Sequence, residues 1–146
     1  MEIAVLALGC FWGPEIKFGK LEGVIKTEVG YCGGNSDTTT YEKVCSGSTN
    51  HAEVVKLEFD QKKISYEKIL KYFFEIHDPT TLNAQGPDIG TQYRSEIFYV
   101  NEYQMKIAEN IIEEMNKKLS DKVVTKLSKL KNYCKAEEYH QKYLEK

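Results

Sequence analysis

The distribution of apolar and polar positions along the chain predicts several short strands. Residues 3–8 form a continuous apolar run with β-branched members, which is typical of a strand buried on both faces of a sheet. Residues 52–59 instead alternate between apolar and polar, which predicts a strand with one buried face. The expected strands are Ile3–Leu8, Val24–Val29, Ala52–Phe59 and Ile97–Val100, with an edge strand at Val123–Leu127.

Helical spacing and capping residues predict helices between these strands. Pro14 suits the first turn of a helix that continues through Phe18. Ser65 and Asn101 are good N-caps. The apolar side chains at helical spacing after these caps are Ile69, Phe73 and Ile76 before Pro79, then Tyr103, Ile107, Ile111 and Met115. A last short helix is expected at Ala136–Leu144.

Two longer segments, Tyr31–Asn50 and Asp78–Arg94, have the polar and glycine-rich composition of loops. The chain of 146 residues shows no repeat and no linker, so we expect a single catalytic domain over residues 1–146. Strands and helices mixed in one small domain predict the α/β (α+β) class. The expected architecture is a two-layer sandwich of a mixed sheet with flanking helices, in a ferredoxin-like arrangement.

Composition and charge argue against several classes of protein. The net charge is −2, which favours neither nucleic acid nor an anionic membrane as a partner. No apolar stretch approaches the ~20 residues of a membrane span, and no secretory signal is recognisable, so we expect a cytoplasmic protein. Its four cysteines, which should then be free thiols, are Cys10, Cys32, Cys45 and Cys134. None of them forms a Cys-x-x-Cys pair, so we expect no metal site.

Cys10 lies where the first apolar run ends and the first helix is expected to begin. A thiol at such a turn is close to unpaired backbone N–H groups and to the positive end of the helix dipole, which favours the thiolate. This placement predicts a nucleophilic cysteine. The other interpretation is a small buried hydrophobic residue, as many free cysteines are.

Glu53 belongs by strand parity to the face that carries Val55, Leu57 and Phe59 and that should be buried. Burial disfavours the charged carboxylate and raises its pKa, so that Glu53 could act as a general acid near neutral pH. The other interpretation is that Glu53 reaches solvent at the end of the strand and has no role.

The loop from His77 to Arg94 holds many hydrogen-bonding groups among two glycines and two prolines. It fits either a loop that lines a functional site or a well-capped surface loop. Three histidines are candidate bases for a Cys–His pair, or hydrogen-bonded structural residues: His51, His77 and His140.

The segment Gly9-Cys10-Phe11-Trp12-Gly13 resembles the signature of the peptide methionine sulfoxide reductase A family. The family's other landmarks follow in order between Gly9 and Leu144: Gly30-Tyr31-Cys32-Gly33-Gly34, Tyr41, Cys45-Ser46-Gly47, His51-Ala52-Glu53, the loop His77–Arg94 and Ala136-Glu137-Glu138-Tyr139-His140-Gln141. The resemblance implies an oxidoreductase that needs no bound cofactor. It would reduce methionine S-sulfoxide, free or in oxidised proteins, and so repair proteins under oxidative stress.

The resemblance also implies roles for individual residues. Cys10 would attack the sulfoxide sulfur, and Glu53 would protonate the sulfoxide oxygen so that it leaves as water. Tyr41 and Tyr93 match the phenols that hydrogen-bond this oxygen. A sulfoxide oxygen is a poor leaving group until it is protonated, so these donors suit the chemistry. The substrate-binding side chains would be Phe11 and Trp12 around the methyl group, and Asp88 as a substrate-side carboxylate.

The chain departs from the family pattern at the recycling step. The implied products are methionine and a sulfenic acid on Cys10, which is then reduced through a disulfide or by an external thiol. Many family members carry resolving cysteines in a tail after the Tyr-His-Gln segment, whereas this sequence ends at Lys146. Cys134 and Cys32 are candidate resolving residues, or ordinary packing cysteines, and Cys45 is common at its position without resolving. Thioredoxin, or glutaredoxin with glutathione, would be the reductant.

Two other functions fit parts of the pattern. A cysteine hydrolase would use Cys10 with His51 or His140 and would cleave esters or peptides without any reductant. A redox sensor or binding protein of the same fold would lack the phenol and carboxyl donors, which this sequence has.

Overall fold

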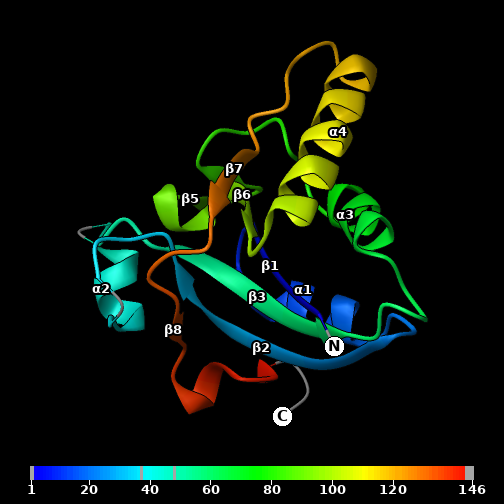
Figure 1. Cartoon of the computed structure of the whole chain (residues 1–146). Helices are drawn as coiled ribbons and strands as arrows, with labels where there is room; N and C mark the ends of the chain where they lie inside the picture. Colours follow the sequence, from blue (N-terminus) through cyan, green and yellow to red (C-terminus); the bar gives the residue numbers. More distant parts are fainter. Residues whose placement is uncertain (1, 37, 48, 144–146) are drawn as a thin grey trace.

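The computed structural model describes residues 2–36, 38–47 and 49–143, and a six-stranded sheet lies at its centre (Figure 1). The strands in their order across the sheet are β7 (Lys126–Lys129), β6 (Ser95–Tyr99), β1 (Glu2–Leu8), β3 (Ala52–Phe59), β2 (Val24–Cys32) and β8 (Cys134–Lys135). Only β6 and β7 pair in parallel, and the other neighbours in this sheet are antiparallel. A separate hairpin is formed by β4 (Ala84–Gln85) and β5 (Asp88–Ile89).

Helices pack on one face of this sheet. α1 (Trp12–Gly19), α3 (Tyr66–Glu75) and α4 (Glu102–Lys118) contribute buried side chains to one cluster with β1 and β3, represented by Phe18, Phe73, Ile111, Leu6 and Leu57. Full burial of such a side chain stabilises the fold by about 1.5–3 kcal/mol. The opposite face holds a smaller cluster around Val5, Val54 and Phe98, against which Leu130 and Tyr133 pack. The expected α/β class and the mixed sheet with flanking helices are therefore confirmed.

The ferredoxin-like detail stays a prediction. β1, α1, β2, β3, α3 and β6 follow one another in the order β-α-β-β-α-β, interrupted by the short helix α2 (Tyr41–Cys45) and the β4–β5 hairpin. The parallel strand β7 and the two-residue strand β8 extend the sheet at its two edges.

The two expected helix caps are present. The Ser65 hydroxyl accepts a hydrogen bond from the Lys68 backbone N–H at 3.1 Å, and α3 follows it. The Asn101 side chain accepts one from the Gln104 N–H at 2.9 Å, and α4 follows it. Each cap satisfies a backbone N–H group that has no partner within its helix.

Both expected loops contain more regular structure than their composition predicts. β2 continues through Tyr31 to Cys32, and α2 forms where only loop was expected, with Thr40 as its cap. The second loop contains the β4–β5 hairpin and a 3₁₀ turn, η1 (Thr91–Tyr93). Short elements such as these are fixed by contacts with the rest of the molecule rather than by their own composition.

Three other expectations of local structure are wrong. Tyr103 is 67% exposed, and Gln104 takes the inward position because its amide donates to the Ile3 carbonyl at 2.7 Å. The last edge strand begins at Lys126 rather than Val123. The helix expected over residues 136–144 is a 3₁₀ turn, η2 (Glu138–His140), and Leu144 lies outside the described residues.

Candidate active site

The candidate site lies where three strand ends meet. β1 and β2 are both antiparallel to β3, so the ends of β1 and β2 lie at the same edge of the sheet as the beginning of β3. Cys10 lies between the end of β1 and the beginning of α1, as the sequence predicts. Glu53 pairs directly with Tyr31 across β3 and β2, so their side chains share the face on which α1 packs.

The Cys10 thiol differs from the sequence-based expectation. The side chain is half-buried, and its pKa is raised to about 11, mainly by burial and to a smaller extent by the charges of Glu53 and Asp88. A hydrogen bond from the Trp12 backbone N–H lowers the pKa, but by less than burial raises it. The expectation that the helix start makes Cys10 a thiolate is therefore wrong, because loss of hydration outweighs one donor. Cys10 is a thiol in this structure.

Glu53 is 1% exposed, so the interpretation that it reaches solvent is wrong. The pKa of its carboxyl is raised to about 8, mainly by burial and to a smaller extent by the charge of Asp88, against a lowering by the Phe11 N–H at 3.4 Å from Oε1. The other oxygen, Oε2, is buried and has no hydrogen-bond partner among the described residues. The site thus contains a neutral carboxyl with one oxygen left to bond to another molecule.

Two phenols lie close to this carboxyl. Tyr41 begins α2, and Tyr93 ends η1. Burial, followed by the charge of Glu53, raises the pKa of Tyr93 to about 12, whereas a hydrogen bond with Tyr41 lowers it. Burial and a hydrogen bond with Cys45 raise the pKa of Tyr41. Both phenols therefore keep their protons and can act as hydrogen-bond donors.

Asp88 reaches the site through the β4–β5 hairpin, which packs directly over the residue before Cys10. A Cβ at Gly9, whose φ is 98°, would lie 2.8 Å from the Gln85 side chain. Glycine at this position therefore allows the hairpin to approach Cys10. Gln85 pairs with Asp88, and the charge of Asp88 acts on both Cys10 and Glu53.

Aromatic side chains form the apolar part of the site. Phe11 is buried against the rings of Tyr31 and His140, with centroid distances of 5.8 and 5.4 Å. The Trp12 indole N–H donates to His140 Nδ1 at 3.1 Å, and the indole stacks on the Tyr143 ring with centroids 4.0 Å apart. Sequence reasoning missed Tyr143. Its position three residues after His140, at the end of the family-like C-terminal segment, was the signal that could have found it.

The three histidines have other contacts than Cys10. His140 faces Trp12, and His51 Nε2 lies 2.7 Å from the Ser36 carbonyl. His77 is bonded through both ring nitrogens, to the Phe73 carbonyl and the Ser95 hydroxyl, and burial lowers its pKa to about 4. Among the described residues no Cys–His pair is seen, so nothing in the geometry favours a hydrolase.

The remaining cysteines lie in different parts of the fold. Cys32 is fully buried in the cluster on the opposite face, with its sulfur 3.2 Å from the Lys131 carbonyl. Cys134 pairs with Tyr31 across β8 and β2, so its side chain is on the Glu53 face. Cys45 is exposed at the end of α2, and all four cysteines are free thiols.

The described part of the chain contains no group of three or more metal-binding side chains. Within the same residues, no helix has the length and apolar character to cross a membrane.

Comparisons with known proteins agree with this geometry. A family model described as peptide methionine sulfoxide reductase matches residues 2–146. A protein of Pelagibacter ubique named peptide methionine sulfoxide reductase MsrA is 76% identical over 146 residues, which cover 100% of this chain and 99% of that protein. Reduced Mxr1 from Saccharomyces cerevisiae has a similar structure, with a TM-score of 0.94 and 40% identity over 99% of this chain and 84% of that one. Mxr1 in complex with Trx2 matches with a TM-score of 0.69 and 27% identity, over 97% of this chain and 84% of that one.

Proposed function

This chain belongs to the peptide methionine sulfoxide reductase family, and we propose how its residues reduce methionine S-sulfoxide to methionine. The observation that carries the proposal is the buried carboxyl of Glu53, which has a raised pKa and one unpaired oxygen beside the half-buried thiol of Cys10. A neutral carboxyl near neutral pH is what departure of the sulfoxide oxygen needs.

The reaction begins with attack of the Cys10 sulfur on the sulfoxide sulfur. The thiol proton and the Glu53 proton pass to the sulfoxide oxygen, which departs as water. The substrate sulfur is then a sulfonium bonded to the Cys10 sulfur. The Glu53 carboxylate then accepts a proton from water as that water adds to the Cys10 sulfur. Methionine departs, Cys10 becomes a sulfenic acid and Glu53 regains its proton, so two electrons pass from the thiol to the sulfoxide.

The other site residues support this reaction by binding. Tyr41 and Tyr93 donate hydrogen bonds to the sulfoxide oxygen, where negative charge develops before protonation is complete. Phe11 and Trp12 provide the apolar surface for the substrate's methyl group. Asp88 lies on the substrate side, where its carboxylate can accept a hydrogen bond from a backbone amide of a protein-bound sulfoxide.

Recycling of Cys10 requires a thiol. The sulfenic acid condenses with the thiol, releases water and forms a disulfide, which a dithiol then reduces. The similarity to Mxr1 in complex with Trx2 supports thioredoxin as that reductant, with glutaredoxin and glutathione as the alternative. Cys134 is the better candidate for an internal resolving cysteine because its side chain shares the Glu53 face of the sheet, whereas Cys32 lies on the other face.

Four free thiols fit a reducing cytoplasm, where we propose that the protein acts. We also propose that residues 1–146 form one catalytic domain.

One single-turnover experiment tests this function. The protein receives one equivalent of mixed methionine sulfoxide epimers without reductant, and chromatography measures each epimer while mass spectrometry measures each cysteine. We expect loss of the S epimer and oxidation of Cys10, either to a dimedone-trapped sulfenic acid or to a disulfide with Cys134. Cys10→Ser should consume neither epimer, and Cys134→Ser should keep the first turnover. Reduction by Cys10→Ser, or consumption of the R epimer, would contradict the proposal.

A further inference from the structure

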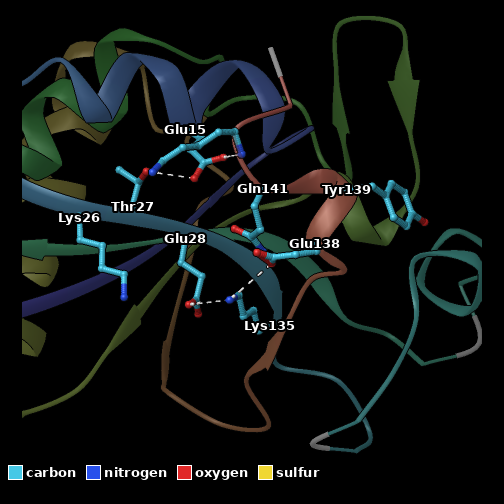
Figure 2. Close-up of a pocket in the computed structure, with 9 residues that line it drawn as sticks. Glu15, Lys26, Thr27, Glu28, Lys135, Glu138, Tyr139 and Gln141 are labelled. Carbon is cyan, nitrogen blue, oxygen red and sulfur yellow. Dashed lines mark hydrogen bonds and ion pairs between the residues drawn. The ribbon is translucent and has the colours of Figure 1, made fainter. Parts of the chain in front are cut away.

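Residues 136–143, the C-terminal strap, cross the edge of β2 and contact both halves of the candidate site. The strap borders a pocket of about 630 Å³ with β2 and α1 (Figure 2). None of the expected site residues lines this pocket. It instead contains Glu15 and Gln141, which hold the later part of the strap in place.

Glu15 holds one end of the strap. Its side chain is 2% exposed, yet its carboxyl accepts hydrogen bonds from the Thr27 hydroxyl at 3.0 Å and from the Lys142 backbone N–H at 2.6 Å (Figure 2). A buried carboxyl is costly unless its oxygens are bonded, so these two donors define where the strap can lie. Lys142 has a φ of 51°, in the left-handed region, which turns its N–H toward Glu15 and the next residue toward α1.

The bond between Glu15 and Lys142 places an aromatic ring of the site. Tyr143 follows Lys142 and stacks on Trp12, which lies one helical turn before Glu15 on α1. Gln141 fixes the strap just before this point, because its side-chain amide bonds both the N–H and the carbonyl of Val29 at 2.9 Å. Glu15 therefore controls the Trp12 side of the site without contacting Cys10 itself.

Glu137 holds the other end of the strap. Its carboxyl accepts hydrogen bonds from the Tyr31 hydroxyl at 2.8 Å and from the Tyr41 backbone N–H at 2.9 Å. Tyr41 is the first residue of α2, so this contact fixes the start of α2 and thereby the position of the Tyr41 phenol. Glu137 therefore controls the phenol side of the site, on which the sulfoxide oxygen is expected.

We propose that Glu15 and Glu137 are positioning residues with separate tasks. Glu15 fixes the Trp12 surface that binds the methyl group, and Glu137 fixes the Tyr41 phenol that donates a hydrogen bond to the sulfoxide oxygen. This division rests on the proposed function. Methyl binding contributes to substrate affinity, whereas bonding to the developing oxygen charge acts on the chemical step. The two carboxyls thus serve opposite ends of one small substrate through one segment of chain.

Single-turnover kinetics with methionine sulfoxide test the division. Glu15→Gln keeps the side chain's shape but leaves one acceptor oxygen, so the amide cannot accept from both the Thr27 hydroxyl and the Lys142 N–H as the carboxyl does. We expect this weaker anchor to raise the half-saturating concentration by about tenfold with little change in the maximal rate. Glu137→Gln should lower the maximal rate by about tenfold with little change in half-saturation, for the same reason. Glu138→Gln is the matched control, because Glu138 neighbours Glu137, is 82% exposed and pairs with Lys135.

Trp12 fluorescence gives a readout that does not depend on activity, because Trp12 is the one tryptophan of the chain. Acrylamide should quench Trp12 more strongly in Glu15→Gln than in the wild type, and equally in the wild type, Glu137→Gln and Glu138→Gln. Lys142→Ala should also match the wild type, because it keeps the backbone N–H that bonds Glu15. Thr27→Val is the alternative if Glu15→Gln fails to fold, because it removes only the hydrogen bond from the Thr27 hydroxyl to Glu15. It should also increase Trp12 quenching and the half-saturating concentration, by a smaller amount.

Equal effects of Glu15→Gln and Glu137→Gln on both kinetic constants would overturn the division of tasks. So would unchanged Trp12 quenching in Glu15→Gln. A wild-type protein inactive on both sulfoxide epimers would instead refute the proposed function, and would leave the quenching test of the strap intact.

Discussion

At the scale of single residues, burial in the site raises the pKa of the Cys10 thiol to about 11 and that of the Glu53 carboxyl to about 8. Both groups therefore carry protons near neutral pH. In the proposed reaction the thiol proton leaves as the sulfur attacks, and the sulfoxide oxygen accepts both protons. Storing Cys10 as a thiol also protects it, because oxidants react with the thiolate.

The rate of the reductase step should follow the proton on Glu53. This carboxyl is protonated below pH about 8 and loses its proton above it, so the single-turnover rate of the wild type should fall as the pH rises through about 8. Glu53→Gln should lower the rate by about 10²–10⁴-fold, the usual contribution of a general acid, and should remove the fall above pH 8. Stopped-flow measurements between pH 6 and about 10 check both expectations. A Glu53→Gln variant with wild-type rates would rule out the acid role.

Sequence reasoning about single residues succeeded where it used the alternation of side chains along a strand. It failed where it used only the helix start beside Cys10. Strand parity placed Glu53 on the buried face correctly, because a strand inside a sheet has only two faces. The pKa of Cys10 was wrong in direction, because the sequence shows the helix start but not how much water the folded loops remove from the sulfur. Tyr143 was missed because its partner Trp12 lies far away in the sequence.

At the scale of elements, the turn after β2 and the start of β3 are packed against each other without spare room. A Cβ at Gly34 would lie 2.1 Å from His51 Nδ1, so Gly34→Ala should lower the free energy of unfolding by about 1–3 kcal/mol, the usual cost of overpacking. Gly13→Ala is the matched control: it lies in α1, where the new Cβ would meet no heavy atom within 4 Å beyond its chain neighbours and its own helix backbone, and it should raise stability by up to about 1 kcal/mol. Urea denaturation measures both, and equal effects of the two substitutions would contradict this packing.

The elements themselves were predictable to the extent that their signals were local. β1, β3, α3 and α4 have long apolar patterns or caps, and each was found close to its true bounds. The short strand β8 was not predicted, because its backbone pairs with β2, about a hundred residues earlier in the sequence. The turn η2 was predicted as a longer helix, although its backbone hydrogen bonds extend only from Glu137 to Gln141.

At the scale of the whole molecule, burying the Glu53 carboxyl has a cost in stability. The unfolded chain loses this proton near the ordinary pKa of 4.5, whereas the folded chain keeps it up to about 8. Between these values the folded state binds more protons than the unfolded state, so the free energy of unfolding falls as the pH rises. The fold therefore carries a functional group that weakens it above pH 4.5, a trade-off common at active sites.

Glu53→Gln should remove this cost, because the amide has no proton to lose. We expect the variant to match the wild type at pH 4 and to be more stable at pH 9, by on the order of a few kcal/mol. Urea denaturation of both proteins at several pH values checks the trend. A stability difference that stays constant from acid to alkaline pH would show that shape rather than charge separates the two proteins.

The C-terminal strap has a consequence for how the protein is made. Ribosomes deliver a chain from its N-terminus, so Cys10 emerges before Glu137, His140 and Tyr143, which follow every strand of the sheet. A nascent chain can pair β1, β2 and β3 while its Trp12 is still uncovered and its α2 unanchored. The candidate site can therefore be completed only after residues 136–143 have been synthesised.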